Sequence, residues 1–171
     1  MMTRHTSCIL SACVLAMITA AAYGPALWCG YIWDDDYHVE HNQALRSIYG
    51  LQRIWFQSGP VPPAFPVSSQ YYPMVYSSFW LEYQIWKLHP AGYHAVNMIL
   101  HAIGTILLWR ILRFLQIPAA WLAAAIFAVH PVHVETVAWI SERKNVLSGV
   151  FYFGAALLYL RFALPPPQQD S

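Results

Sequence analysis

Four long stretches of this 171-residue chain contain no Asp, Glu, Lys or Arg, and they constrain its fold more than any other feature. They cover residues 6–33, 88–109, 114–134 and 145–160. An α-helix rises about 1.5 Å per residue, so ~20 apolar residues cross the ~30 Å hydrocarbon core of a bilayer. The fourth stretch reaches this length because the long side chain of Arg161 can extend its charge to the membrane surface. The stretches predict four transmembrane helices, at about residues 8–28, 92–112, 116–132 and 146–164.

The composition supports a membrane protein and disfavours several soluble classes. Apolar residues make up 58% of the chain and charged residues only 10%, whereas a soluble domain averages about 25% charged residues. A net charge of +1 provides no electrostatic footprint for nucleic acid. We therefore expect an all-α polytopic membrane protein whose partner is membrane lipid and not nucleic acid. Residues 1–164 would form one membrane domain, with short interfacial helices in its outer loops, and residues 165–171 a polar tail.

Basic residues in short loops predict the orientation, because Lys and Arg accumulate on the cytoplasmic side of a membrane. Four arginines fall on one side of a four-helix zigzag, namely Arg4, Arg110, Arg113 and Arg161. With that side in the cytoplasm, both termini are cytoplasmic and residues 29–89 and 130–144 form outer loops. We expect this multi-pass arrangement in a bacterial inner membrane.

The first outer loop begins with three consecutive acidic residues, Asp34, Asp35 and Asp36. Adjacent carboxylates at a membrane surface could supply a general base or a cation site. On spacing alone, a solvated acidic turn after a helix is the more common explanation. Asp36 with His38 and His41 forms only a weak metal-ligand pattern, so we expect no metal site.

The rest of the first outer loop predicts a linker followed by a helix at the membrane surface. Residues 58–66 contain four prolines, which lack amide donors and so exclude a helix. Further on, aromatic residues recur at steps of three and four, which places them on one helical face. An aromatic belt at the lipid headgroups is the favoured interpretation, and a sugar-stacking platform is the alternative. The aromatic residues are Tyr72, Tyr76, Phe79, Tyr83 and Trp86.

The second predicted span carries a polar stripe of His94, Asn97, His101 and Thr105 at helical spacing. Lipid cannot satisfy these polar groups, so the stripe should face other helices or a polar cavity. Structural bonding between helices and a functional site both fit this pattern.

A second group of charged residues lies in the outer loop at residues 130–144. If this segment is helical beyond Pro131, one face carries Glu135, Trp139, Glu142 and Arg143. A planar guanidinium suits phosphate, so Arg143 with Lys144 could hold the phosphate of a lipid-linked donor. The alternative is a surface helix whose ion pairs contribute little to stability.

Four groups of residues, in the same order across about three quarters of the chain, carry a resemblance to a known family. They are Trp33-Asp34-Asp35 with Asn42, Tyr71-Tyr72-Pro73-Met74 with Ser78-Phe79, Gly92-Tyr93-His94 with Asn97 and His101, and His130-Pro131-Val132-His133-Val134-Glu135 with Arg143. Together they resemble the N-terminal membrane region of the transmembrane and tetratricopeptide-repeat proteins. That family includes O-mannosyltransferases of the type C glycosyltransferase superfamily.

The resemblance implies an enzyme that transfers a mannose-like sugar from a polyprenyl-phosphate donor to Ser or Thr hydroxyls of acceptor proteins outside the cytoplasm. Asp35, or else Asp34, would accept the proton of the attacking hydroxyl. Arg143 and Lys144 would bind the donor phosphate. No cofactor is expected. Four further residues would support the site, namely Glu135, His133, Asn97 and His101.

The sequence departs from the family pattern at two points. Many relatives have Arg at the position of Tyr72, and family members continue through further transmembrane helices and a repeat array, whereas this sequence contains no 34-residue repeat. We therefore expect a truncated N-terminal portion that is inactive alone and needs a chain supplying the missing helices. The alternatives are a non-catalytic membrane anchor or assembly module, and a transferase that glycosylates a lipid.

Overall fold

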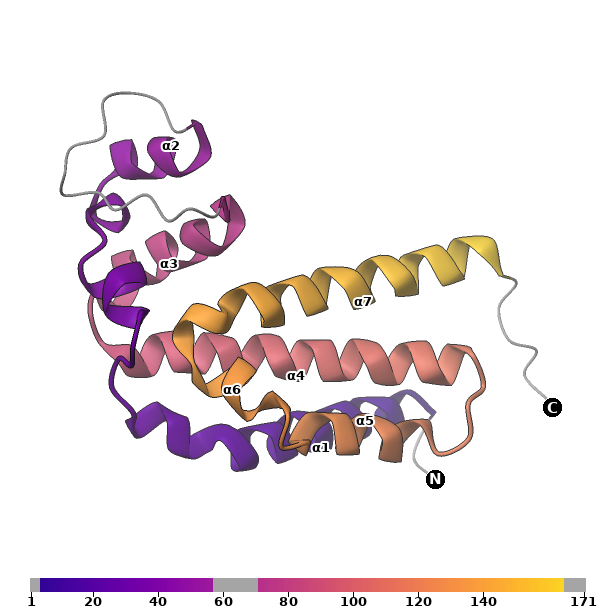
Figure 1. Cartoon of the computed structure of the whole chain (residues 1–171). Coiled ribbons are helices and arrows are strands. Elements are labelled where there is room, and N and C mark those ends of the chain that lie inside the picture. Colours follow the sequence, from indigo (N-terminus) through magenta and orange to yellow (C-terminus); the bar gives the residue numbers. More distant parts are fainter. Residues whose placement is uncertain (1–3, 57–70, 165–171) are drawn as a thin grey trace.

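The structure is a computed structural model that describes residues 4–56 and 71–164, and the regular elements of these residues are all helical (Figure 1). The predicted all-α class is therefore confirmed. The predicted linker at residues 58–66 and the predicted tail at residues 165–171 lie outside the described residues. The elements are α1 (Arg4–Tyr23), η1 (Gly24–Trp28), η2 (Asp36–Glu40), η3 (Gln43–Arg46), α2 (Ile48–Phe56), α3 (Pro73–Trp86), α4 (Pro90–Phe114), α5 (Ala120–Val129), α6 (His133–Ala138), η4 (Ile140–Glu142) and α7 (Arg143–Ala163).

Three helical segments of the described chain are long and apolar enough to cross a membrane. They cover Thr6–Trp28, Pro90–Phe114 and Ile140–Ala163, with 23, 25 and 24 residues. Each rises more than ~30 Å, the thickness of the hydrocarbon core. Pro90 lies in the first turn of α4, where the N–H that proline lacks would have no helical partner. These segments correspond to the first, second and fourth predicted spans.

The third predicted span, at residues 116–132, is not a helix of spanning length. Helix α5 has 10 residues and rises only ~15 Å, about half the hydrocarbon core. It begins after Ala119, whose φ is 55°, and ends before His130, which is extended because Pro131 follows it. The prediction of four full-length transmembrane helices is therefore wrong for this segment. Figure 1 nevertheless shows α5 alongside α1, which it contacts.

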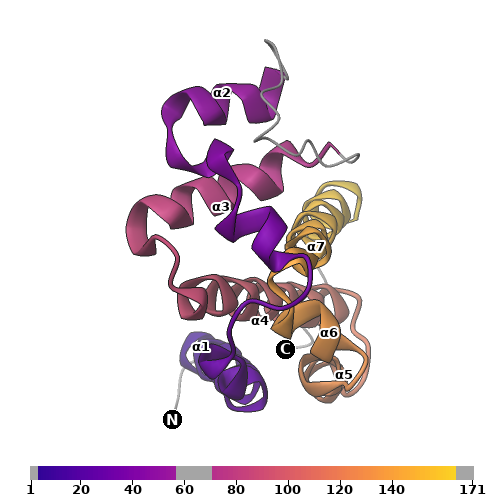
Figure 2. The ribbon, with the colours of Figure 1, turned by 60° about the vertical axis from the view of Figure 1, so that its left-hand side comes forward.

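Helix α4 is the centre of the bundle. It contacts α1, α5 and α7, which surround it in Figures 1 and 2. Leu15 of α1, Trp109 of α4 and Ala124 of α5 belong to one buried apolar cluster. The bundle is therefore assembled around the helix that carries the predicted polar stripe.

The described chain starts and ends at the same end of the bundle (Figure 1). Arg113, near the end of α4, donates a hydrogen bond to Sγ of Cys8 in α1 at 3.1 Å. Arg161 of α7 borders the same hollow as Cys8, Arg110 and Arg113. The arginines of α4 and α7 therefore share one end of the bundle, as the zigzag predicts.

The other end of the bundle is covered by an outer layer formed by α2, α3 and the short helices before them (Figures 1 and 2). The predicted aromatic helix is α3, but its aromatic face packs against protein. Phe79 is buried with Val39, Leu45, Tyr93 and Ile140 in a core that joins both outer loops to α4. Helix α3 therefore holds the outer layer together, which a lipid-facing aromatic belt would not do.

Thiols introduced at Arg46 and at Gln116 should be labelled from opposite sides of the membrane. Arg46 lies in η3 of the outer layer, whereas Gln116 follows the far end of α4, and both are exposed. Labelling with a membrane-impermeant maleimide in sealed and opened vesicles, with the three natural cysteines replaced, makes the measurement. Labelling of both positions from one side would contradict this arrangement.

Candidate functional site

Asp35 is a buried carboxylate at the point where the two outer loops meet. Its exposed fraction is 0%. It accepts a hydrogen bond from the backbone N–H of Ile32 at 3.2 Å, which closes a tight turn through Trp33, whose φ is 52°. The backbone N–H of Ser141 donates to it at 2.8 Å, and the Ser141 hydroxyl also donates to it. These donors offset the cost of burying the carboxylate.

Asp34 is the accessible member of this acidic pair, the name used below for Asp34 and Asp35. Its side chain is 48% exposed. The Ser141 hydroxyl lies 2.9 Å from Oδ1 of Asp34, and since it has one hydrogen it donates mainly to one carboxylate of the pair at a time. Oδ2 of Asp34 lies 3.4 Å from Nε2 of His38. Asp34 is therefore the carboxylate of the pair that is accessible from solvent.

His38 connects the acidic pair to α3. Its Nδ1 lies 2.7 Å from the hydroxyl of Tyr76. Burial lowers the pKa of His38 below its usual value, while the negative charge of Asp34 acts to raise it and the positive charge of Lys144 lowers it further. The imidazole is therefore mainly neutral at pH 7, with one ring nitrogen available as an acceptor.

Arg143 is buried at the start of α7, and all five of its N–H groups can be matched to partners in the protein. Nε donates to Oδ1 of Asn97. The terminal nitrogens donate to both carboxylate oxygens of Glu82, to the hydroxyl of Ser78 at 3.0 Å and to the carbonyl oxygen of Tyr93 at 3.0 Å. These bonds join α3, α4 and α7, and the group is called the Arg143 network below.

This geometry corrects the expectation that Arg143 binds a donor phosphate. Its exposed fraction is 0%, and its hydrogen-bond donors are already engaged. Burial raises the pKa of Glu82, although the hydrogen bond and charge of Arg143 oppose that shift. Asn97, predicted to support the site, also donates to the carbonyl oxygen of Trp139 at 2.9 Å. Both residues therefore hold helices in place.

Lys144 and Glu135, the other charged residues predicted in the second outer loop, have different surroundings. The Lys144 side chain is 33% exposed, and its Nζ lies 2.6 Å from Oε1 of Glu142. It lies three residues after Ser141, whose hydroxyl contacts both members of the acidic pair, and its positive charge lowers the pKa of His38. Glu135 is exposed on α6 and forms no ion pair with the residues that the structure describes. Lys144 therefore remains a candidate for binding a substrate anion.

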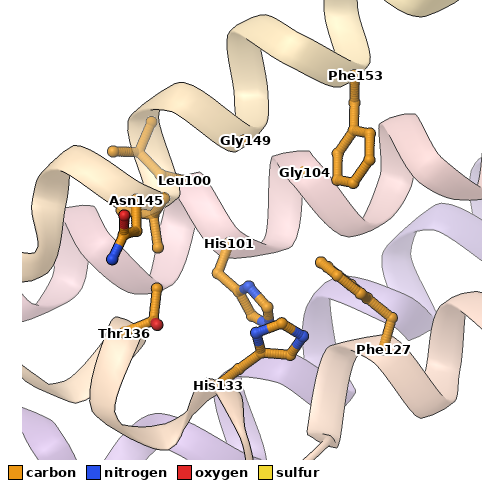
Figure 3. A pocket seen from close by; sticks show the side chains of 10 residues that line it. Leu100, His101, Gly104, Phe127, His133, Thr136, Asn145, Gly149 and Phe153 are labelled. Atoms are coloured by element: carbon orange, nitrogen blue, oxygen red, sulfur yellow. The ribbon is translucent and has the colours of Figure 1, made fainter.

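His101 and His133, predicted as supporting residues, line a separate cavity of about 220 Å³ among α4, α5, α6 and α7 (Figure 3). Their ring centres lie 5.1 Å apart, and Nε2 of His101 lies 3.1 Å from the carbonyl oxygen of Ala128. Burial lowers the pKa of His133, and the nearby His130 lowers it further. The acidic pair does not line this cavity, so the predicted site residues divide into two groups.

Two residues that complete these contacts, Ser141 and Glu82, were not among those predicted from the sequence. Ser141 lies in η4. The extended backbone of Trp139, just before η4, interrupts the helix that the sequence pattern of this segment would form. Glu82 is the only acidic residue between Glu40 and Glu135, and an isolated carboxylate in an aromatic helix is a signal that could have identified it. Across residues 4–56 and 71–164, no group of three His, Cys, Asp or Glu side chains is arranged for a metal ion.

Arg143→Ala should lower the free energy of unfolding by about 3–5 kcal/mol, because it leaves the buried Glu82 carboxylate unpaired. The double variant Arg143→Met/Glu82→Met should recover most of this loss, since both charges are removed together. The control Lys144→Ala breaks a partly exposed ion pair and should cost at most about 1 kcal/mol. Denaturant unfolding in detergent micelles makes the comparison. Equal losses for Arg143→Ala and Lys144→Ala would contradict the proposed packing role.

Asp34→Asn should lower the pKa of His38 further, because it removes a charge and a hydrogen bond that raise it. Lys144→Gln should shift the same pKa upward by removing a positive charge. Asp36→Asn removes an exposed carboxylate that is not among the main influences on His38 and serves as the control. Histidine NMR titration of each variant measures these shifts. If the pKa of His38 were the same in the Asp34→Asn variant as in the unmodified chain, the contact between His38 and Asp34 would not form.

Comparison with known proteins finds relatives for most of this chain. It is 31% identical over 152 residues to protein O-mannosyl-transferase TMTC3 of Mus musculus, an alignment that covers 86% of this chain and 16% of that protein. It is 34% identical over 148 residues to protein O-mannosyl-transferase Tmtc1 of Drosophila melanogaster, covering 83% and 17%. Protein O-mannosyl-transferase TMTC2 of Homo sapiens is 29% identical over 157 residues, covering 86% and 19%. No family model matches the chain, and no solved structure matches it significantly.

The chain spans about a sixth of the length of the TMTC3 relatives that it matches. All of the relatives described above are animal proteins, so they do not support the expected bacterial inner membrane. The similarity extends over more than four fifths of this chain and includes several different TMTC proteins. It confirms the resemblance carried by the four sequence motifs: over most of its length, this chain is similar to TMTC proteins.

Proposed function

We propose that this chain forms the acceptor-activating part of a membrane protein O-mannosyltransferase. The observation that carries the proposal is the half-exposed carboxylate of Asp34, held between the Ser141 hydroxyl and the His38 ring where the outer loops meet. General-base catalysis requires a carboxylate fixed within reach of the proton it accepts. The relatives are named as protein O-mannosyl-transferases, which supports sugar transfer as the reaction that this base would serve.

In the proposed reaction, Asp34 accepts the proton of a Ser or Thr hydroxyl while the hydroxyl oxygen attacks the anomeric carbon of the sugar. A bond forms between these two atoms, and the bond from the anomeric carbon to the donor phosphate breaks. The phosphate leaves with the electron pair as polyprenyl phosphate, so the anomeric configuration inverts. Once Asp34 has accepted the proton, the Ser141 hydroxyl can donate fully to Asp35.

Lys144 is the residue of this chain that we propose for the donor phosphate. Its side chain is partly exposed, and it lies three residues after Ser141, which contacts both members of the acidic pair. A positive charge placed where the leaving phosphate develops charge stabilises the transition state. Arg143 acts indirectly, because it anchors the start of α7 next to both Lys144 and Ser141.

We propose that the outer layer faces the extracytoplasmic side and that the arginine end of the bundle is cytoplasmic, since short loops rich in Arg stay inside. Segments of the relatives that this chain does not span would provide the remaining walls of the active site. The chain alone is therefore expected to show little transfer.

A non-catalytic assembly role is the second candidate. It is favoured by the Arg143 network, in which a motif residue is engaged in packing and is closed to substrate. Under that role, the exposure of Asp34 would have no consequence for sugar transfer.

A chimera of the mouse relative, in which this chain replaces the matching 152-residue segment, separates the two roles. The assay follows labelled mannose from a polyprenyl-phosphate donor to a Ser/Thr peptide. Asp34→Asn keeps the size of the side chain but removes the base, so the transfer rate should fall by about 100-fold or more. The control Asp36→Asn changes an exposed neighbour and should keep the rate of the unmodified chimera. Undiminished transfer by the Asp34→Asn chimera would overturn the catalytic proposal and favour the assembly role.

A further inference from the structure

The end of the bundle opposite the outer layer carries arginines that the proposed reaction does not use. Arg110 and Arg113 lie near the end of α4, and Arg161 lies in the last turn of α7. All three border one hollow of about 230 Å³, together with Cys8 and Phe114. Two helices therefore bring three guanidinium groups to one place, called the arginine hollow below.

No described carboxylate neutralises the arginine hollow. The acidic residues of the described chain lie in η2 and the residues just before it, in α3, in α6 and in η4, toward the other end of α4. Helix α4 has 25 residues and rises ~37 Å between the two ends. Arg110 and Arg161 are exposed, and neither has a hydrogen bond or ion pair with a described residue. The hollow therefore has three positive charges and available N–H donors.

Arg113 is held in place at this hollow. One of its terminal nitrogens donates to Sγ of Cys8 at 3.1 Å, and its guanidinium carbon lies 5.0 Å from the centre of the Trp109 ring. Trp109 is buried, so the ring is a fixed support for the planar guanidinium. A guanidinium that is already positioned loses less conformational entropy when it binds an anion.

The position of the arginine hollow and the exposed apolar side chains around it suit a bound lipid headgroup. It lies where the three candidate membrane spans approach one end of the bundle. Because each span is longer than the ~30 Å hydrocarbon core, we expect its ends to reach the headgroup phosphates. Large apolar side chains beside it are exposed: Phe162, next to Arg161, is 90% exposed, and Ile9, next to Cys8, is 59% exposed. Acyl chains can cover such side chains, whereas a soluble anion cannot. Orientation of the helices by charge alone requires arginines at this end but does not require them to border one hollow.

We propose that the arginine hollow binds the phosphate of an anionic phospholipid, with the acyl chains packed along the exposed apolar residues of α1 and α7. Guanidinium groups form paired N–H···O bonds with phosphate oxygens, which a zwitterionic lipid satisfies less well because it carries its own positive charge. This inference does not depend on the proposed transferase activity.

Native mass spectrometry of the purified full chain, titrated with phosphatidylglycerol or phosphatidylcholine in neutral detergent, tests the proposal. The variant Arg110→Gln/Arg161→Gln removes two exposed charges from the hollow. Each of the two substitutions is expected to weaken phosphatidylglycerol binding by about fivefold. Arg110→Lys/Arg161→Lys keeps the charge but removes the planar fork, so an intermediate loss is expected. Arg46→Gln/Lys87→Gln removes the same number of exposed charges from the outer layer and should bind like the unmodified chain. Circular dichroism checks that each variant is folded.

Three results would overturn the proposal. The first is equal binding of phosphatidylglycerol by the unmodified chain and a folded Arg110→Gln/Arg161→Gln variant. The second is equal binding of both lipids by the unmodified chain. The third is displacement of phosphatidylglycerol by inorganic phosphate at the same concentration, which would show that the hollow recognises a soluble anion without need of the acyl chains. Selective binding that is lost in the glutamine variant and resists inorganic phosphate supports the lipid site.

Discussion

The buried guanidinium of Arg143 joins the outer layer to the helical bundle, and the arrangement of both depends on it. Removing such a charge from water costs several kcal/mol, which only a full set of partners offsets. Glu82 and Ser78 of α3 and Asn97 and Tyr93 of α4 supply that set. All of these partners bond to the same guanidinium. A shift or rotation of α3, α4 or α7 relative to the other two would therefore leave a buried polar group without a partner.

The Arg143 network also fixes the position of the acidic pair. Ser141 lies two residues before Arg143, and both the backbone N–H and the hydroxyl of Ser141 bind Asp35. The position of Asp34 in turn follows from Asp35, its neighbour in the chain, and from His38, which bonds to Tyr76 of α3. A substitution in the network would therefore disturb the acidic pair even though Arg143 cannot itself touch a substrate. This separates residues that hold the site from residues that could act in it.

The chemistry of the molecule is divided between its two ends. The described carboxylates lie in α3, in or just before η2, and in α6 and η4. The exposed arginines of α4 and α7 lie at the other end of the bundle, without a described carboxylate beside them. The ~37 Å length of α4 and the apolar surfaces of α1 and α7 separate the two. The cavity lined by His101 and His133 lies among α4, α5, α6 and α7, and the acidic pair does not line it.

Much of the fold follows from local properties of the sequence. The lengths of the apolar runs predict α1, α4 and α7, and the spacing of aromatic residues predicts α3, because length and helical periodicity need no distant partner. Even the early end of α5 has a local cause in Pro131, which a count of charge-free residues overlooks. The convergence of the two outer loops on the acidic pair, by contrast, depends on Ser141, whose contacts with Asp34 and Asp35 span more than a hundred residues of chain.

The role of Arg143 was decided by tertiary structure alone. In the sequence, an arginine beside Glu142 and Lys144 at the start of an apolar helix has the same pattern whether it faces a phosphate or the protein interior. Arg143 is buried in the protein because it bonds to Glu82, 61 residues away in the chain, and to Asn97, 46 residues away. The sequence by itself determined an all-α membrane protein with acidic and basic ends. Which charges are buried and which stay accessible was decided by packing, because burial is stable only where distant partners complete the hydrogen bonds.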